Sequence, residues 1–353
     1  MRNPDLSQAS NTGPDGLCRQ MAKRQEASSN MRSVCQLFSL ATVLLRSLMV
    51  IGKEIRRELR KWLSPPDSSI NHNIARKAHH RGTSNWFFRG GIFNKWRSSP
   101  SLLWIHGKRM LPAFLYHHLI HLICIFAAGS GKSVLWLVAS LLLSTWLAQV
   151  TISSGIIEDI MALRETGSAC LAYFYFDFRD EEKQSCRHLV LSILSQLAAQ
   201  SDLFCDILSC LHLAHDDGGR KPSDSALIQC LKEMLLLPTQ GPVYLIVDAL
   251  DECPNHTGLP TAREEVLGLI QDLVDLHLPN VHICVTSRPE IDIRTTLESL
   301  ASFHISLHNQ CGQTKDIMDY VSSIVYSDKM MQRWREEDRI LVIKTLSERA
   351  DGM

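Results

Sequence analysis

The sequence predicts an α/β fold in which a parallel sheet is covered by helices on both faces. From Ser101 onward, short apolar runs alternate with amphipathic helical segments, and the apolar runs contain few polar residues. Such runs are typical of strands buried on both faces, as in parallel sheets. The chain has 353 residues, of which 45% are hydrophobic and 21% charged, enough for one large or two medium domains with apolar cores.

The charge balance indicates which partners to expect, and the cysteine pattern indicates the cellular compartment. The 37 basic residues balance the 37 acidic ones, so composition gives no reason to expect nucleic acid as a partner. The 11 cysteines form no C-x-x-C pair, and residues 1–30 contain no apolar signal segment. We therefore expect a cytoplasmic protein with reduced thiols.

The N-terminal region is expected to precede the sheet domain as a disordered segment, a helix and a polar linker. The helix should end before Ser64, where "SPPD" begins, because proline cannot continue a helix. Its apolar part is short and contains Arg46, so we expect an amphipathic helix that docks on a partner or on the main domain. The alternative is a role at a membrane surface or in self-association. The predicted boundaries are 1–33 for the disordered segment, 34–83 for the helix and linker, 84–328 for the sheet domain and 329–353 for the start of a truncated C-terminal helical segment.

The predicted elements alternate along the main domain. Strands are expected within 101–107, 169–178, 242–248, 280–289 and 302–308. Helices are expected within 186–200, 225–237, 264–278, 314–326 and 335–350. The aromatic segment "NWFFRGGIFNKW" is expected to pack against the sheet edge; in the alternative, Trp86 and Phe87 stack near a nucleotide base.

The run "VYLIVDALDEC" ends a buried strand in carboxylates. Asp248 should lie at the carboxyl edge of the sheet, where open α/β folds bind ligands, and Asp251 and Glu252 follow on the same turn. This is the form of a Walker B motif. Asp248 would hold Mg²⁺ through water or alongside Ser133, and Glu252 would orient or deprotonate the attacking water. The alternative is an acidic turn exposed to solvent.

The next strand, in "HICVTSRP", ends near Arg288. At that strand tip a guanidinium could contact the γ-phosphate and report its hydrolysis. The alternative is an ordinary arginine before a helix.

The segment "GSGKS" has the end of a phosphate-binding loop without its beginning. The full pattern, G-x-x-x-x-G-K-[ST], needs a glycine where Phe126 stands. Removing residues 109–127 joins the flanks as "WIHGKAGSGKS", which fits the pattern with Gly107 as the first glycine. The residues then expected to bind nucleotide are Gly107, Lys108, Gly129, Ser130, Gly131, Lys132, Ser133 and Arg288.

Removing a second run, residues 136–152, restores an amphipathic helix behind the loop. In the joined chain Leu135, Ile156, Ile160 and Leu163 fall on one face. Each removal restores a local rule, so both runs are interpreted as insertions or translated introns.

A membrane hairpin at 110–157 is the alternative interpretation of the two apolar runs. Each run approaches the length of a membrane span. Pro112 and three histidines within the first run argue against it, and the flanks carry no orienting charge bias.

Together these motifs resemble the NACHT-type NTPases of fungal STAND proteins, the nephrocystin-3-like N-terminal domain. The stretches "GTSNWFF", "LLWIHGK" with "AGSGKSV", "PVYLIVDALDEC" and "HICVTSRPEIDI" carry a resemblance that spans about residues 60–353. It implies a P-loop NTPase fold, ATP or GTP with Mg²⁺, and a switch between a resting monomer and an active oligomer. It also implies that Lys132 and Ser133 bind phosphate and Mg²⁺, that Asp248, Asp251 and Glu252 form Walker B, and that Arg288 is a sensor.

The sequence departs from this family in two places: the phosphate-binding loop is interrupted, and the chain stops at Met353, where such proteins continue into a helical segment and a repeat array. We therefore expect a nucleotide-binding signalling switch with weak NTP hydrolysis, as a fragment of a larger intracellular receptor. Protein partners would bind through the N-terminal helix or the missing repeats. The alternatives are a catalytically inactive interaction module or a membrane-anchored protein; a DNA-handling ATPase is disfavoured by the balanced charge.

Overall fold

The computed structural model describes the sheet and most of the helices around it. The described residues are 50–78, 85–107, 152–238, 241–256, 258–307, 318–319, 322–323, 325–327 and 331–350. The chain divides into a unit of residues Met1–Glu58 and a larger unit of residues Leu59–Met353. Residues 50–58 are helical in the first unit, and the sheet lies in the second.

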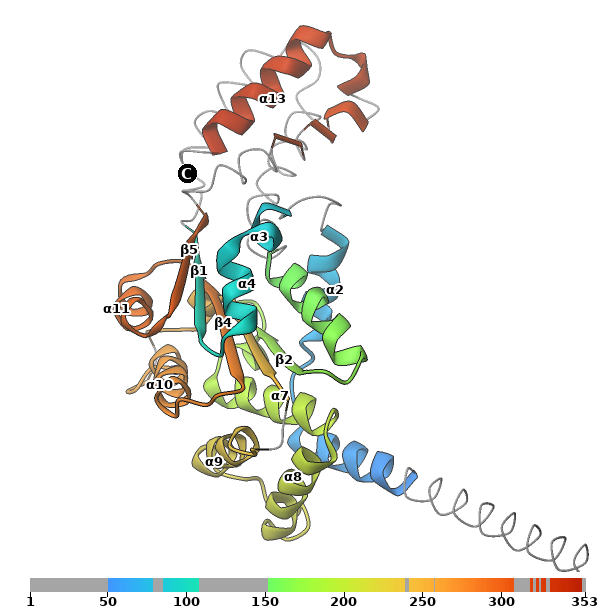
Figure 1. The fold of residues 1–353 in the computed structure, drawn as a ribbon, viewed down its shortest axis with the longest axis vertical. Helices are drawn as coiled ribbons and strands as arrows, with labels where there is room; N and C mark the ends of the chain where they lie inside the picture. Colours follow the sequence, from blue (N-terminus) through green and yellow to red (C-terminus); the bar gives the residue numbers. More distant parts are fainter. Residues whose placement is uncertain are drawn as a thin grey trace, which may run out of the picture. The chain divides into compact units, whose positions relative to one another are not determined.

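Five parallel strands form the sheet, which confirms the predicted fold class (Figure 1). They are β1 (Leu102–His106), β2 (Cys170–Tyr175), β3 (Val243–Asp248), β4 (Val281–Ser287) and β5 (Phe303–Ser306). Their order across the sheet is β2-β3-β4-β1-β5, with every neighbouring pair parallel. All five strands fall within the predicted segments, and the second is shorter than the predicted 169–178.

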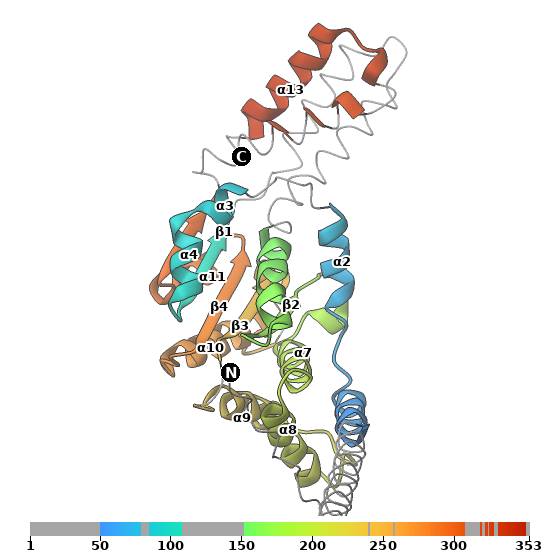
Figure 2. The same cartoon turned by 45° about the vertical axis from the view of Figure 1, so that its right-hand side comes forward.

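Helices cover both faces of the sheet (Figure 2). The larger hydrophobic cluster lies on the face covered by α7 (Cys186–Ala198), α8 (Asp202–Ala214), α9 (Asp224–Leu235), α10 (Ala262–Asp275) and α11 (Ile291–Leu300). The smaller cluster lies on the face covered by α3 (Asn85–Arg89), α4 (Gly91–Ser98) and a helix over 152–165. Side chains alternate between the clusters along each strand: in β3, Leu245 and Val247 belong to the first, and Tyr244 and Ile246 to the second.

The helices predicted at 186–200, 225–237 and 264–278 are confirmed as α7, α9 and α10. A side-chain N-cap marks where each of the three begins, with Ser223 accepting from the Ala226 N–H at the start of α9. The Ser185 side chain accepts a hydrogen bond from the His188 N–H at the start of α7, and Thr261 forms a capping box with Glu264 at the start of α10. The last predicted helix, at 335–350, is confirmed as α13 (Glu336–Ala350). Helices α8 and α11 were not predicted.

The expected polar linker contains a further helix, α2 (Ser69–Ala78), so that part of the prediction was wrong. The preceding helix ends at residue 63, as "SPPD" predicts. The α2 sequence is polar overall, but its His72 and Ala75 are buried. His72 Nδ1 lies 3.2 Å from the Tyr175 hydroxyl, and its Nε2 lies 2.9 Å from Glu158 Oε1. Polar tertiary contacts thus help to dock a helix whose two isoleucines, Ile70 and Ile74, are exposed.

The aromatic segment before β1 packs on the sheet, as expected. Phe87, Phe93 and Trp96 are buried in the smaller cluster, and Trp96 Nε1 donates to the Ile283 carbonyl at 3.1 Å. Phe87 therefore belongs to the core, and stacking on a base is not its role. The side chain of Trp86 lies outside the described residues.

The apolar stripe predicted behind the phosphate-binding loop is present where the structure describes it. Ile156 and Ile160 are fully buried and Leu163 packs against the same cluster, whereas Leu135 lies outside the described residues. Most of the alternative membrane hairpin, residues 110–151, also lies outside them. Among the described residues, no helix has the length and apolarity needed to cross a membrane.

Candidate functional site

The connections of the sheet reverse between β1 and β4. The described helix between β1 and β2, residues 152–165, covers the face of the smaller cluster, whereas α11, between β4 and β5, covers the face of the larger one. Adjacent parallel strands whose connections leave to opposite faces form a topological switch point, and ligands bind outside the carboxyl ends of such strands. Gly107 and Arg288 directly follow these two strand ends, and the Gly107 N–H donates to the Ser287 carbonyl at 3.4 Å.

Asp248, at the carboxyl end of β3, is buried among hydroxyl groups. Its side chain is on the same face as Tyr244 and Ile246, toward helix 152–165, and only 1% of the residue is exposed. The carboxylate accepts hydrogen bonds from the Thr286 and Ser153 hydroxyls. Burial raises the pKa of Asp248 to about 6, although these hydrogen bonds oppose the shift.

The turn after Asp248 is held by a left-handed backbone residue and by the Thr286 side chain. Ala249 has a φ of 55°, in the left-handed region, and its N–H donates to Thr286 Oγ1 at 3.1 Å. The chain then enters the short helix η2 (Leu250–Glu252), which carries the other two acidic residues. Thr286 thus holds both Asp248 and the turn that follows it.

Asp251 and Arg288, which the sequence assigned to separate roles, contact each other. Arg288 Nε lies 3.1 Å from Asp251 Oδ2, and the Arg288 backbone N–H donates to Oδ1 at 3.0 Å. Burial raises the pKa of Asp251, and the Arg288 guanidinium opposes that shift. In this state the predicted sensor is therefore paired with the Walker B turn.

Glu252 lies at the other side of the same turn. Its Oε2 accepts a hydrogen bond from the Phe178 N–H at 3.2 Å, and burial raises the pKa of Glu252 to about 7. A carboxyl group with a pKa near neutrality is suited to take a proton from water. Of the two acidic residues on η2, Glu252 is better placed than the arginine-paired Asp251 to act as a base.

Sequence reasoning missed three residues of this cluster. Ser153 and Thr286 hold Asp248, and the buried Arg263, in the first turn of α10, donates to the Asp251 and Cys253 carbonyls at 2.6 and 2.8 Å. Only Arg263 carried a signal in the sequence. A cation in the first turn of a helix opposes the helix dipole, so it needs another partner.

The oxygen donors around Asp248 fit magnesium. Mg²⁺ prefers oxygen ligands and is usually held by one or two carboxylates, with waters and substrate phosphates completing its shell. Asp248 and the Ser153 hydroxyl supply such oxygens. Within the described part of the chain, no group of three or more His, Cys, Asp or Glu residues could hold a metal ion.

The remaining predicted phosphate-binding residues lie outside the described residues. They are Lys108, Gly129, Ser130, Gly131, Lys132 and Ser133. Of the predicted site, the structure therefore describes Gly107, the three acidic residues and Arg288.

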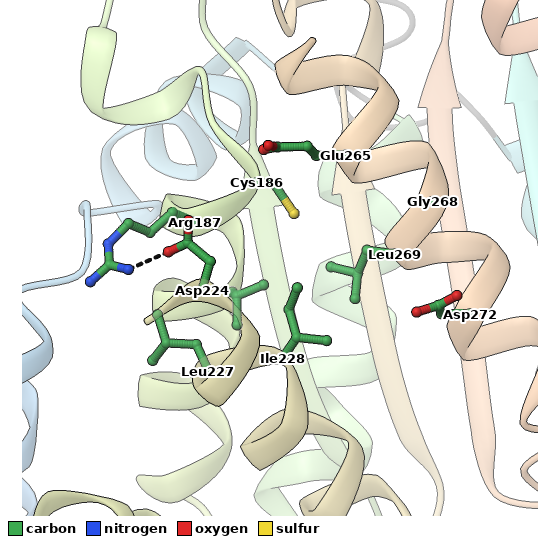
Figure 3. A pocket seen from close by; sticks show the side chains of 10 residues that line it. Cys186, Arg187, Asp224, Leu227, Ile228, Glu265, Gly268, Leu269 and Asp272 are labelled. Carbon is green, nitrogen blue, oxygen red and sulfur yellow. Dashed lines mark hydrogen bonds and ion pairs between the residues drawn. The ribbon is translucent and has the colours of Figure 1, made fainter. Parts of the chain in front are cut away.

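A separate pocket of about 310 Å³ opens between α7, α9 and α10 (Figure 3). Apolar side chains, including Val190, Leu227 and Leu269, line it, and Arg187 pairs with Asp224 at its rim. No predicted site residue contributes to its lining.

Comparisons with known proteins give one family match to part of the chain and solved structures of low sequence identity. Residues 118–288 match the family "Nephrocystin 3, N-terminal", which confirms the predicted resemblance over a shorter range than 60–353. No curated protein sequence matches the chain significantly. Drosophila ORC bound to DNA is 11% identical, with a TM-score of 0.30, over 79% of this chain and 55% of that one. Drosophila ORC bound to AT-rich DNA and Cdc6 is 10% identical, with a TM-score of 0.26, over 77% and 38%. The chain thus spans about half or less of the length of these structures.

Proposed function

We propose that the chain is the nucleotide-binding part of a STAND-type signalling switch, a proposal supported by the match of residues 118–288 to the family "Nephrocystin 3, N-terminal". It would bind ATP or GTP with Mg²⁺ and hydrolyse it slowly. The observation that carries the proposal is the Asp248 carboxylate, buried beneath the Thr286 and Ser153 hydroxyls next to a topological switch point.

The contact between Ser153 and Asp248 also supports the assignment of Ser133. When residues 136–152 are removed, Ser133 stands three residues before Ser153. Residues three apart on a helix share one face, so a continuous helix would place both hydroxyls toward Asp248. Ser133 would then be one turn closer to the start of the helix, where phosphates bind.

The residues divide the chemistry among them. Lys132 and the backbone amides of the loop would contact the phosphates, and Asp248 with Ser133 would hold Mg²⁺. Bound Mg²⁺ would neutralise charge on the phosphate oxygens. Glu252 would orient and deprotonate the attacking water, and Arg288 would contact the γ-phosphate in exchange for part of its contact with Asp251. The contacts of Arg288 would thus differ between the nucleotide states. This difference would shift the protein between a resting monomer and an active oligomer.

An inactive interaction module is the second candidate. It is favoured by the segment 109–127, which in this sequence separates Gly107 from "AGSGKS". The loop binds phosphate only when consecutive N–H groups surround it at a helix N-terminus. In a chain that retains this segment, the sheet domain would still fold, but the interrupted loop would not bind a nucleotide.

One experiment separates the two candidates. The mature transcript is sequenced across the codons for residues 100–165, and peptides from 109–127 and 136–152 are sought in the purified protein. Fluorescent ATP and GTP are then titrated with and without Mg²⁺ into the chain so defined.

We expect both segments to be absent and Mg²⁺-dependent binding to be lost in Lys132→Ala but kept in Lys95→Ala, which changes an exposed lysine on α4. Retention of both segments, together with no binding of either nucleotide, would contradict the switch and favour the inactive module.

A further inference from the structure

Arg263 joins the two loops that carry the predicted catalytic and sensor residues. Toward the loop after β3, its Nη2 donates to the Asp251 carbonyl at 2.6 Å and its Nε donates to the Cys253 carbonyl at 2.8 Å. Toward the segment after β4, its Nη1 lies 2.5 Å from Glu290 Oε2 and 3.2 Å from Oδ2 of Asp292, in the first turn of α11. One side chain on α10 therefore holds four groups from two loops.

The burial of Arg263 shows that these contacts are specific. Its side chain is only 5% exposed, and a buried guanidinium is tolerated when carboxylates and carbonyls accept its hydrogen bonds. The planar fork of donors in arginine can reach acceptors in several directions at once, which the single ammonium of lysine cannot. The contacts at this position therefore depend on the shape of the guanidinium as well as on its positive charge.

Arg288 connects the same two segments through contacts of its own. Asp251, whose carbonyl Arg263 holds, accepts the Arg288 side chain and backbone N–H through its carboxylate. Glu290, whose carboxylate Arg263 holds, follows Arg288 by two residues. The position of Arg288 is thus set from the Asp251 side and from the Glu290 side, and both depend on Arg263.

We propose that Arg263 is a positioning residue that clamps the loops 249–254 and 287–292 together and thereby sets Arg288 for contact with a γ-phosphate. The nucleotide part of this inference rests on the proposed function. Arg263 itself touches no reacting group. Through Arg263, a change at the nucleotide site would reach α10 and, by way of Glu290 and Asp292, the start of α11.

The first arm of the test needs no nucleotide. Hydrogen–deuterium exchange is measured on the full chain and on Arg263→Gln, Arg263→Lys and the control Arg294→Gln, which changes an exposed arginine on α11 paired with Glu298. Both Arg263 variants should exchange faster in the two loops together, by about tenfold, because bonds to a buried charged group are lost. The control should match the unsubstituted chain. Unchanged exchange in 287–292 would overturn the clamp.

The second arm measures a property that general loosening would not change. Binding of ATPγS and of ADP, or of GTPγS and GDP, is compared in the same proteins. Arg263→Gln should lower the preference for the triphosphate analogue by about fivefold or more while diphosphate affinity stays the same, because only the γ-phosphate contact depends on Arg288. Arg263→Lys should restore little of that preference. Equal weakening of both nucleotides would overturn the positioning role.

Two further results keep the inference separate from folding defects and from the proposed function. Glu290→Gln removes only the shorter of the two ion pairs that Arg263 makes with the segment after β4. It should lower the preference for the triphosphate analogue to a smaller degree, and this result can be read even where Arg263→Gln fails to fold. Failure of the unsubstituted chain to bind any nucleotide would overturn the proposed function. The exchange measurement would still decide whether Arg263 clamps the loops.

Discussion

Arg288 holds Asp251 through two bonds, one from its backbone N–H at 3.0 Å and one from its guanidinium Nε at 3.1 Å. The backbone bond fixes the strand end, and the side-chain pair fixes the arginine. Because the Asp251 side chain is 4% exposed, its charge depends on this partner. Arg288 therefore stabilises the turn after β3 whether or not it also contacts a phosphate.

Arg288→Ala should destabilise the free protein by roughly 3 kcal/mol, because the buried Asp251 carboxylate loses its partner. Adding Asp251→Asn should recover part of this loss, since the amide carries no charge that needs compensation. The free energy of unfolding of the three proteins in urea measures both effects. The control Arg294→Ala, on an exposed pair of α11, should leave stability nearly unchanged. Equal losses in the single and double variants would show that the ion pair is not the cause.

The backbone of this fold could be predicted from the sequence, because its strands are buried on both faces. β3 and β4 are continuous apolar runs, and Asp248 is placed simply by being the last residue of one of them. The polar docking of α2 could not be predicted, since His72 meets Glu158 and Tyr175 only in the folded chain. The same holds for the site: a carboxylate at a strand end can be recognised from one segment, but the role of Arg263 depends on partners from two separate segments, after β3 and after β4.

The contribution of Asp248 to stability in the absence of divalent ions should fall as pH rises from about 4 to about 7. Burial raises the pKa of Asp248 from 3.8 to about 6, so the folded form binds a proton more tightly than the unfolded form. That contribution, on the order of 3 kcal/mol, is fully present below pH 4 and is lost as pH rises through 6. Asp248→Asn should flatten this part of the profile, and the exposed control Asp272→Asn should not. Thermal unfolding in EDTA across this pH range is the measurement, and parallel profiles for all three proteins would refute the assignment.

Glu252→Gln should separate nucleotide binding from hydrolysis. The amide oxygen can still accept the Phe178 N–H, so the turn and nucleotide affinity should be preserved. Hydrolysis should fall by about 100-fold or more, because glutamine cannot take a proton from water.

In the unsubstituted protein, the hydrolysis rate should rise with pH through about 7, the raised pKa of Glu252. Phosphate release, measured in the form of the chain that binds nucleotide, tests both points, with the exposed Glu233→Gln as control. Full hydrolysis in Glu252→Gln would assign the base elsewhere.

Ile160→Ala tests whether the helix at 152–165 packs on the sheet in solution. Ile160 is fully buried in the smaller cluster with Ile156, so its truncation leaves a cavity and should destabilise the protein by about 2–5 kcal/mol. Leu213→Ala, on an exposed site of α8, should change stability by about 0.5 kcal/mol or less. Urea unfolding of both variants gives the comparison. An unchanged stability in Ile160→Ala would mean that the helix is not packed this way. Ser153, three residues before Ile156 on the same helix, would then have no fixed position beside Asp248. The membrane-hairpin interpretation of 110–157 would regain support from that result, because its last residues would be free to leave the sheet.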